Sequence, residues 1–364
     1  MSHESHERNK LNLAAKITLI FTFIIILAGN IVRITGSGMG CPDWPKCFGY
    51  YIPPSDISTV QLQEGRTYAK GQMVIYHDTL WKTEREFIYS SDFWRTNVPS
   101  PNFIKSLDYS EFNLGSPEFL KIYPKHQYAK FNSLHTWIEY INRLLTALLG
   151  IPLIILTYFA LSLFKKNKDY WPLIYVFLCV FLSLFEAWLG KMVVDKNLNT
   201  STITLHMVGS LGILLSLLFL IRRTSDVPNI TLPATLRRAL SFFFLIHLVQ
   251  LLLGTQVRES VDLLLENGIG RNILIENLPV GFKIHRSFSI LIVILSTMIY
   301  LQYSRLENKP RKLFYLFIVL GFEILFGIGM AYFGVPIALQ PLHLLFSIIL
   351  FALSGMLLLE SKKK

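Results

Sequence analysis

The sequence predicts an all-α membrane protein in which eight transmembrane helices form two four-helix bundles related by a pseudo-twofold axis. Three observations support this fold class. Hydrophobic residues make up 52% of the 364 residues and charged residues only 16%, which is too apolar for a soluble domain of this size. The apolar residues gather in runs long enough to cross a bilayer. The two halves of the chain also repeat each other, as duplicated membrane units do.

The apolar runs give the expected helices in order along the chain. We expect them at about residues 14–34, 134–163, 171–194, 202–222, 236–258, 281–303, 312–333 and 337–359. The first run follows a polar stretch and lacks a small-residue cleavage site, so we interpret it as an anchor rather than a removed signal peptide.

The internal repeat aligns without gaps at several places. FEAWLGKMVVDKNLNTSTITLHMVGS aligns with FEILFGIGMAYFGVPIALQPLHLLFS, so Glu186 and Glu323 each precede a histidine by 20 residues. Upstream, EYINR aligns with FKIHR, and GNIVR with GTQVR. The matched pairs are Arg33 with Arg258, Asn142 with His285, Arg143 with Arg286, and His206 with His343.

Basic residues mark every second loop and the end of the chain. They are Lys165, Lys166, Lys168, Arg222, Arg223, Arg237, Arg238, Arg305, Lys309, Arg311, Lys312 and Lys362–Lys364. This alternation accounts for the net charge of +11 and places those loops and both termini in the cytoplasm. A solvated basic face is the alternative, but strict alternation favours topology, and nucleic acid is not an expected partner.

The predicted domains follow from the repeat and the loops. They are a cytoplasmic N-terminus at 1–13, a first four-helix half at 14–222 with an outer loop insertion at about 35–133, a cytoplasmic linker at 223–235, a second half at 236–359 and a basic tail at 360–364. The insertion is too long for a structureless connector, so we expect a small folded cap over the first half.

This topology places the repeated polar residues near the outer face, within bundles able to hold a cofactor between facing helices. In the second half, His285 and His343 suit the two axial positions of a haem. Zinc would require a third or fourth ligand nearby, and the sequence indicates none. The alternative is a pair of core histidines, but ionisable residues inside a membrane are usually functional. The unmatched His247 is interpreted as a packing residue.

Four arginines accompany these positions. They are Arg33, Arg143, Arg258 and Arg286. Haem propionates would pair with them through charge-assisted hydrogen bonds. The alternative is that they extend to the lipid headgroups.

The first half differs from the second in its ligands. It has His206, but Asn142 where the second half has His285, and Glu139 lies one turn before Asn142 on the same helix face. One good axial ligand, an open face and a carboxylate indicate a reaction site rather than an electron-transfer site. His135 lies on this face about 10 Å further out, as a substitute ligand, a propionate partner or an interfacial residue.

Cys41 and Cys47 flank two prolines and a tryptophan in the first outer loop. Outside the cytoplasm a disulfide is permitted, and closing so short a ring would stabilise the fold by about 2 kcal/mol. Reduced thiols are the alternative. Cys179, in the third apolar run, is interpreted as a small packing residue.

The stretch GNIVRITGSGMGCPDWPKC, followed by EYINR, LGKMVVDKNL and TLHM, resembles the haem A synthase family of membrane enzymes over nearly all eight helices. The resemblance implies a b-type haem held by His285 and His343 in the second half. It implies that the first half binds haem O and oxidises its methyl group to the formyl group of haem A, with a required glutamate at Glu139. The family's first-half histidines fall on His206 and Asn142, so this chain departs from the pattern at Asn142.

Two classes of function therefore stand. The first is a haem A synthase for cytochrome oxidase assembly, with haem b as cofactor and haem O and haem A as substrate and product. The alternative is a diheme membrane cytochrome b that transfers electrons without substrate chemistry. Candidate partners are an electron donor, a haem O-forming enzyme and further copies of the chain. The expected location is the cell inner (plasma) membrane, with the haem sites toward the outer face.

Overall fold

The computed structural model describes residues 3–76, 79–90, 120–122, 131–195 and 200–363. Within these residues, eight helical segments are long and apolar enough to cross a membrane. They are His6–Ile34, Ser133–Asn167, Trp171–Val193, Thr204–Thr224, Ala234–Leu265, Val280–Ser304, Arg311–Tyr332 and Leu339–Glu360. The predicted number and order of spans are confirmed.

The long helices are α1 (His3–Ile34), α4 (Ser133–Leu148), α5 (Gly150–Asn167), α6 (Trp171–Asp195), α7 (Thr200–Thr224), α8 (Ala234–Glu266), α10 (Val280–Ser304), α11 (Arg311–Tyr332) and α12 (Leu339–Glu360), and α9 (Leu274–Asn277) is short. The strands are β1 (Thr67–Tyr68), β2 (Met73–Tyr76), β3 (Thr79–Thr83), β4 (Phe87–Ile88), β5 (Leu120–Ile122), β6 (Ile230–Leu232) and β7 (Ser361–Lys363). The second span is interrupted between α4 and α5, where Pro152 has no N–H to donate to the carbonyl of Leu148.

The chain divides into two compact units. We call Met1–Asn30, Thr146–Gly190 and Thr200–Lys364 the helical unit, and Ile31–Leu145 with Lys191–Asn199 the inserted unit. Each unit is described by itself.

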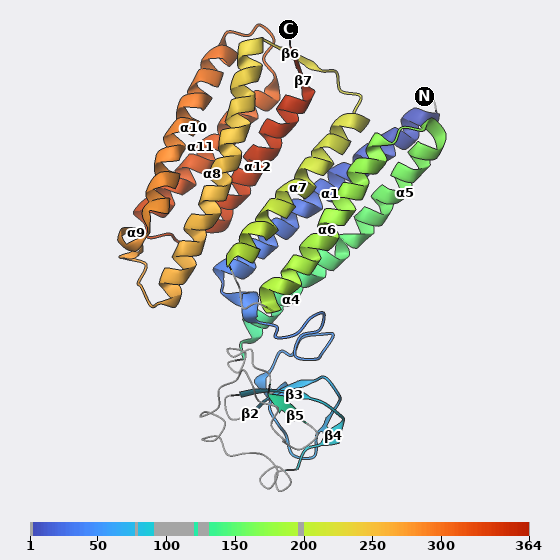
Figure 1. Ribbon diagram of the computed structural model, residues 1–364, viewed down its shortest axis with the longest axis vertical. Helices are drawn as coiled ribbons and strands as arrows, with labels where there is room; N and C mark the ends of the chain where they lie inside the picture. The colour runs from blue at the N-terminus through green and yellow to red at the C-terminus, as the bar shows by residue number, and fades with distance from the viewer. Residues whose placement is uncertain (1–2, 77–78, 91–119, 123–130, 196–199, 364) are drawn as a thin grey trace. The chain divides into compact units, whose positions relative to one another are not determined.

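The helices of the helical unit form two groups (Figure 1), α1 with α5, α6 and α7, and α8 with α10, α11 and α12. Each group has its own apolar core, which includes Leu156 and Leu217 in the first and Phe243 and Leu316 in the second. A further cluster joins α7 to α8 and α12 through buried side chains: Leu211, Leu214, Leu251, Ile348 and Phe351. This arrangement is compatible with two bundles, and the pseudo-twofold axis stays a prediction.

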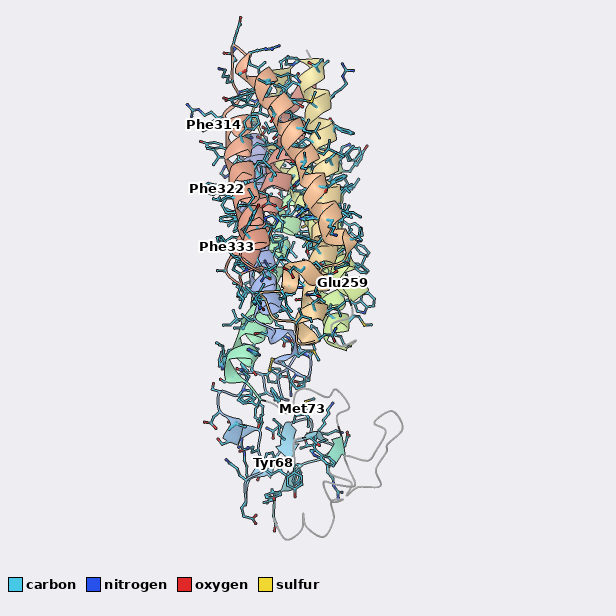
Figure 2. The ribbon with its side chains drawn as sticks, turned by 90° about the vertical axis from the view of Figure 1, so that its left-hand side faces the viewer. Tyr68, Met73, Glu259, Phe314, Phe322 and Phe333 are labelled. Atoms are coloured by element: carbon cyan, nitrogen blue, oxygen red, sulfur yellow. A yellow bond between two sulfur atoms is a disulfide. The ribbon has the colours of Figure 1, made fainter. Side chains whose placement is uncertain are left out.

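Large apolar side chains on the outside of the helices remain exposed. Phe314 and Phe322 point outward from α11, and Phe333 follows its end (Figure 2). Their exposed fractions are 51%, 44% and 76%. Such a surface is unfavourable in water and suits contact with lipid.

Both termini of the helical unit lie at the same end as the α5–α6 and α10–α11 turns (Figure 1). The predicted linker and tail pair there, because β6 runs parallel to β7. The chain before residue 14 is helical rather than a separate segment. Asn12, on this helix, donates to the main-chain carbonyl of Ile221 on α7 at 2.9 Å and so attaches the first turns of α1 to α7.

The inserted unit carries the strands of the predicted outer loop. β2, β3 and β5 form one antiparallel sheet, and β1 pairs with β4. Tyr68, Val74, Trp81 and Phe87 form one core, while Met73 belongs to a second core with the two cysteines (Figure 2). The described part of the insertion is therefore folded, as its length predicts. Its residues 91–119 and 123–130 lie outside the described residues, and its place over the first half stays a prediction.

Candidate functional site

In the second half, His285 on α10 and His343 on α12 come from helices that both pack against α8. Each imidazole ring lies against a glycine of a neighbouring helix. A Cβ atom added at Gly254 would lie 3.2 Å from Cε1 of His285, and one at Gly327 would lie 3.3 Å from Cε1 of His343. The two imidazoles are near enough to interact electrostatically. The structure therefore brings together the two histidines that the sequence predicts as ligands.

The Nδ1 atoms of His343 and His285 differ in their polar contacts. Nδ1 of His343 lies 3.1 Å from the main-chain carbonyl oxygen of Glu323 and 3.4 Å from Oε1 of the same residue. Gln250 on α8 donates to the main-chain carbonyl of His285 at 3.0 Å. Nδ1 of His285 is buried, and it has no hydrogen-bond partner among the described residues.

The donor set of this site fits a haem. Two imidazoles on separate helices suit the two axial positions of its iron, and each ring occupies the space that a side chain on its neighbouring glycine would need. In the part of the chain that the structure describes, no group of three or more His, Cys, Asp or Glu side chains could hold a metal ion directly. His247 is not part of this set, since its Nε2 contacts the carbonyl of Ser347 at 3.0 Å and its ring stacks on Phe243.

In the first half, His206 on α7 has a carboxylate beside it. Nδ1 of His206 lies 2.7 Å from Oε2 of Glu186 on α6. The ring N–H does not point along this contact, so it is a close polar contact rather than an aligned hydrogen bond. Ser210 donates to the same carboxylate oxygen at 3.1 Å. The His206 side chain is 44% exposed, whereas the Glu186 side chain is 9% exposed.

Glu139 and Asn142 lie on α4 in the inserted unit. Glu139 is only 4% exposed. Its Oε2 accepts a hydrogen bond from the backbone N–H of Cys41 at 2.8 Å, and its Oε1 forms an ion pair with Arg143. Arg143 lies one turn after Glu139 on α4, and the carboxylate of this pair is buried rather than at the helix surface.

Arg143 holds the loop that the two cysteines close. Its guanidinium donates to the carbonyl oxygens of Asp43 at 2.5 Å, Lys46 at 3.1 Å and Cys41 at 3.1 Å. Cys41 and Cys47 form a disulfide, as predicted. The C-P-D-W-P-x-C motif therefore folds onto α4, and Arg143 and Glu139 are the side chains that attach it there.

Three further contacts fix this loop. Gly40 approaches the backbone of His135 so closely that a Cβ atom would lie 2.5 Å from its carbonyl oxygen. Thr136 donates to the carbonyl of Gly40 at 2.9 Å. Asp43 accepts from the N–H of Gly49 at 2.8 Å, while burial raises the pKa of its carboxyl group. The first turns of α4 and the motif thus form one packed element.

The remaining predicted arginines lie on α1, α8 and α10. Arg33 lies in the last turn of α1. Arg258 pairs with Asp262 at 2.5 Å within α8, and Arg286 lies 5.8 Å from the ring centroid of Phe282. A propionate-binding role for the arginines stays a prediction.

Several residues near the histidines have no role that the sequence alone indicates. Glu186 and Glu323 mark the repeat in the sequence, whereas no pattern singles out Ser210, Ser347, Gly254 or Gly327. For the two glutamates a signal is present, because burying a carboxylate in mid-span costs free energy and both halves do so at the same register. What the sequence could not show was that each glutamate contacts the histidine 20 residues later.

Two comparisons with known proteins bear on the chain as a whole. A family model described as "Cytochrome oxidase assembly protein" (COX15-CtaA) matches residues 13–89 and 109–354. A protein of Shewanella oneidensis named "Heme A synthase" is 44% identical over 46 residues, which cover 13% of this chain and 14% of that protein. The family match spans both halves of the repeat and the disulfide loop. The chain is a multi-pass membrane protein that belongs to the cytochrome oxidase assembly protein family.

Proposed function

We propose that this chain is a haem A synthase, which oxidises the methyl group of haem O to the formyl group of haem A. Membership of the cytochrome oxidase assembly protein family supports a role in supplying haem for the assembly of cytochrome oxidase. The short match to a protein named "Heme A synthase" supports the reaction.

The observation that carries the proposal is the difference between repeat-related ligands. The second half presents the matched pair His285 and His343, each ring lying against a glycine. In the same register, the first half presents His206 with Asn142, and adds the buried carboxylate of Glu139. Pure electron transfer favours matched ligand pairs, whereas substrate oxidation requires an open coordination position.

In the second half, His285 and His343 would hold a b-type haem, which would supply one-electron transfer when bound. With both imidazoles engaged as ligands, this half would offer no place for oxygen or substrate to bind. Gly254 and Gly327 let the two rings pack closely against α8 and α11, because an added Cβ would lie 3.2 Å and 3.3 Å from Cε1 of His285 and His343. We assign this half to electron transfer.

By the repeat register, His206 would bind the iron of the substrate, haem O. Asn142 occupies the position of the second histidine, and as a weak ligand it would leave a coordination position for oxygen. Replacing two hydrogen atoms of the methyl group by one oxygen atom is a four-electron oxidation, so protons must leave the site. Glu139 holds or moves such protons, or positions the methyl group, as a buried carboxylate can.

The sites lie toward the outer face of the cell inner (plasma) membrane in this proposal. The basic turns at the end that carries both termini support a cytoplasmic location for that end. The disulfide supports an oxidising location for the inserted unit. An electron donor and a haem O-forming enzyme are the partners that the reaction requires.

Pigment extraction tests the proposal. The chain is expressed together with a haem O-forming enzyme, and the extracted haems are separated by chromatography and identified by mass. We expect haem A and haem b. Haem b with unchanged haem O would contradict the synthase and favour the diheme cytochrome.

A further inference from the structure

Two carboxylates that the proposed reaction does not use contact the two repeat-related histidines. Glu186 on α6 lies 2.7 Å from Nδ1 of His206 through its Oε2. Glu323 on α11 lies 3.4 Å from Nδ1 of His343 through its Oε1, and its main-chain carbonyl lies 3.1 Å from that nitrogen. The same nitrogen of each ring is therefore approached by the same residue of the repeat.

A serine completes each arrangement. Ser210, one turn after His206, donates to Oε2 of Glu186 at 3.1 Å. Ser347, one turn after His343, hydrogen-bonds the carboxyl group of Glu323. Residues four apart share a helix face. In each half, one helix thus presents a histidine and a serine to a single carboxylate on the facing helix.

Burying each of these two carboxylates inside an apolar span costs free energy. Glu186 is 7% exposed, and its Oε1 is buried against Gly209 without a hydrogen-bond partner among the described residues. A buried carboxylate within an apolar span is kept only when something compensates for its lost hydration. A helix-packing contact alone would not explain why both halves place this group on the ring nitrogen of the histidine.

The contact on Nδ1 determines which nitrogen remains for a ligand. When one ring nitrogen of a histidine donates its proton to a carboxylate or carbonyl, the other nitrogen carries the lone pair that binds a metal. For His343, Nδ1 is engaged by Glu323, and Gly327 lies against Cε1 on the ring edge. Nε2 is therefore the nitrogen left to bind iron.

We propose that Glu186 and Glu323 are positioning residues that orient His206 and His343 and increase the electron donation of Nε2 to haem iron. This inference rests on the proposed function through the identity of the bound group. The carboxylate is closer to the ring in the first half, at 2.7 Å, than in the second, at 3.4 Å.

The test uses the second half of the purified full chain with its bound haem b and no haem O. Three variants are compared with wild type: Glu323→Ala, Glu323→Gln and Ser347→Ala. The measurements are the rate of haem transfer to apomyoglobin, the reduction midpoint potential, and the EPR g values of the oxidised haem, which depend on the orientation of the axial imidazoles. Glu360→Gln is the matched control, because Glu360 is buried on α12 but pairs with Lys312.

We expect Glu323→Ala to lose haem about tenfold to a hundredfold faster and to shift the g values. Glu323→Gln keeps an acceptor and should retain haem, but at a more positive potential, because an amide oxygen accepts the ring N–H more weakly than a carboxylate oxygen does. Ser347→Ala should shift the potential to a more negative value, since the carboxylate loses a donor and interacts more strongly with the ring. Glu360→Gln should match wild type.

Several results would overturn the inference. Wild-type haem loss and g values in Glu323→Ala would do so, as would equal shifts in Glu360→Gln. If Glu323→Ala does not accumulate, Ser347→Ala decides, and a shift that is absent or positive contradicts the proposal. A wild-type chain without haem b would instead contradict the proposed function, which keeps the two failures distinct.

Discussion

The carboxylate of Glu139 accepts a hydrogen bond from the backbone N–H of Cys41 at 2.8 Å, across 98 positions of sequence. This contact links the disulfide loop to the helix that carries Asn142. It also gives Glu139 a definite structural partner besides Arg143. A catalytic and a structural role therefore have to be separated by experiment, and isosteric substitution is the means.

The two halves should differ in what their histidines hold. His285→Ala or His343→Ala removes one of two axial imidazoles, so the low-spin b-type absorption of the purified protein should disappear. His206→Ala should leave that absorption in place, because His206 belongs to the first half of the repeat. Optical spectra of the reduced proteins make the comparison. Loss of the same b-type signal in all three variants would contradict the division of roles.

The glycine beside His343 should be required for haem binding. A Cβ atom at Gly327 would lie 3.3 Å from Cε1 of the ring, so Gly327→Ala should displace the imidazole and weaken haem b binding. Gly321→Ala on the same helix is the matched control, since nothing lies within 4 Å of an added Cβ there. Alanine also raises helix propensity by about 1 kcal/mol, so neither variant should unfold α11. Equal haem content per protein in the two variants would exclude this role for Gly327.

Asn142 should control access to the iron of the substrate haem. If His206 is its one strong axial ligand, Asn142→His supplies a second, and the haem O-loaded protein should become six-coordinate and low-spin. Resonance Raman or EPR spectra report this change directly. An unchanged spectrum would mean that His135 or another residue already fills the position.

The orientation of the chain follows from the basic turns. A reporter active only in the cytoplasm should be active when fused after Lys168, at the end of α5. The same reporter inserted between Glu84 and Arg85, in the exposed turn between β3 and β4, should be silent. The reverse pattern would place every candidate site on the cytoplasmic face.

Most of the helical architecture could be predicted because apolar runs and an internal repeat depend only on local sequence. Helix ends were less predictable. α8 continues past Arg258 to Glu266, since Val261 is buried against Leu274, Leu278 and Val335 in a cluster that the sequence does not reveal. The strands of the inserted unit are not predictable from the sequence, because they are short and their pairing depends on turns that bring them together.

The candidate site was predicted unevenly. Repeat register identified His206, His285 and His343, since a duplicated polar residue in an apolar span stands out. The burial of Glu139 depends on Cys41 and Arg143, and only the folded loop brings these groups together. The contacts of Glu186 and Glu323 required the facing helices to be placed side by side. The alignment of the repeat matches residues of the two halves with each other, but it does not show which side chains are in contact.

The most direct measurement compares the haems extracted from wild type and from Glu139→Gln, each expressed with a supply of haem O. Glutamine keeps the shape of the side chain and can still accept from Cys41, but it cannot carry the negative charge. We predict haem A in wild type, and in the variant bound haem b with haem O or its alcohol in place of haem A. Haem A at wild-type yield from Glu139→Gln would contradict the catalytic assignment and leave Glu139 as a structural partner of Cys41 and Arg143.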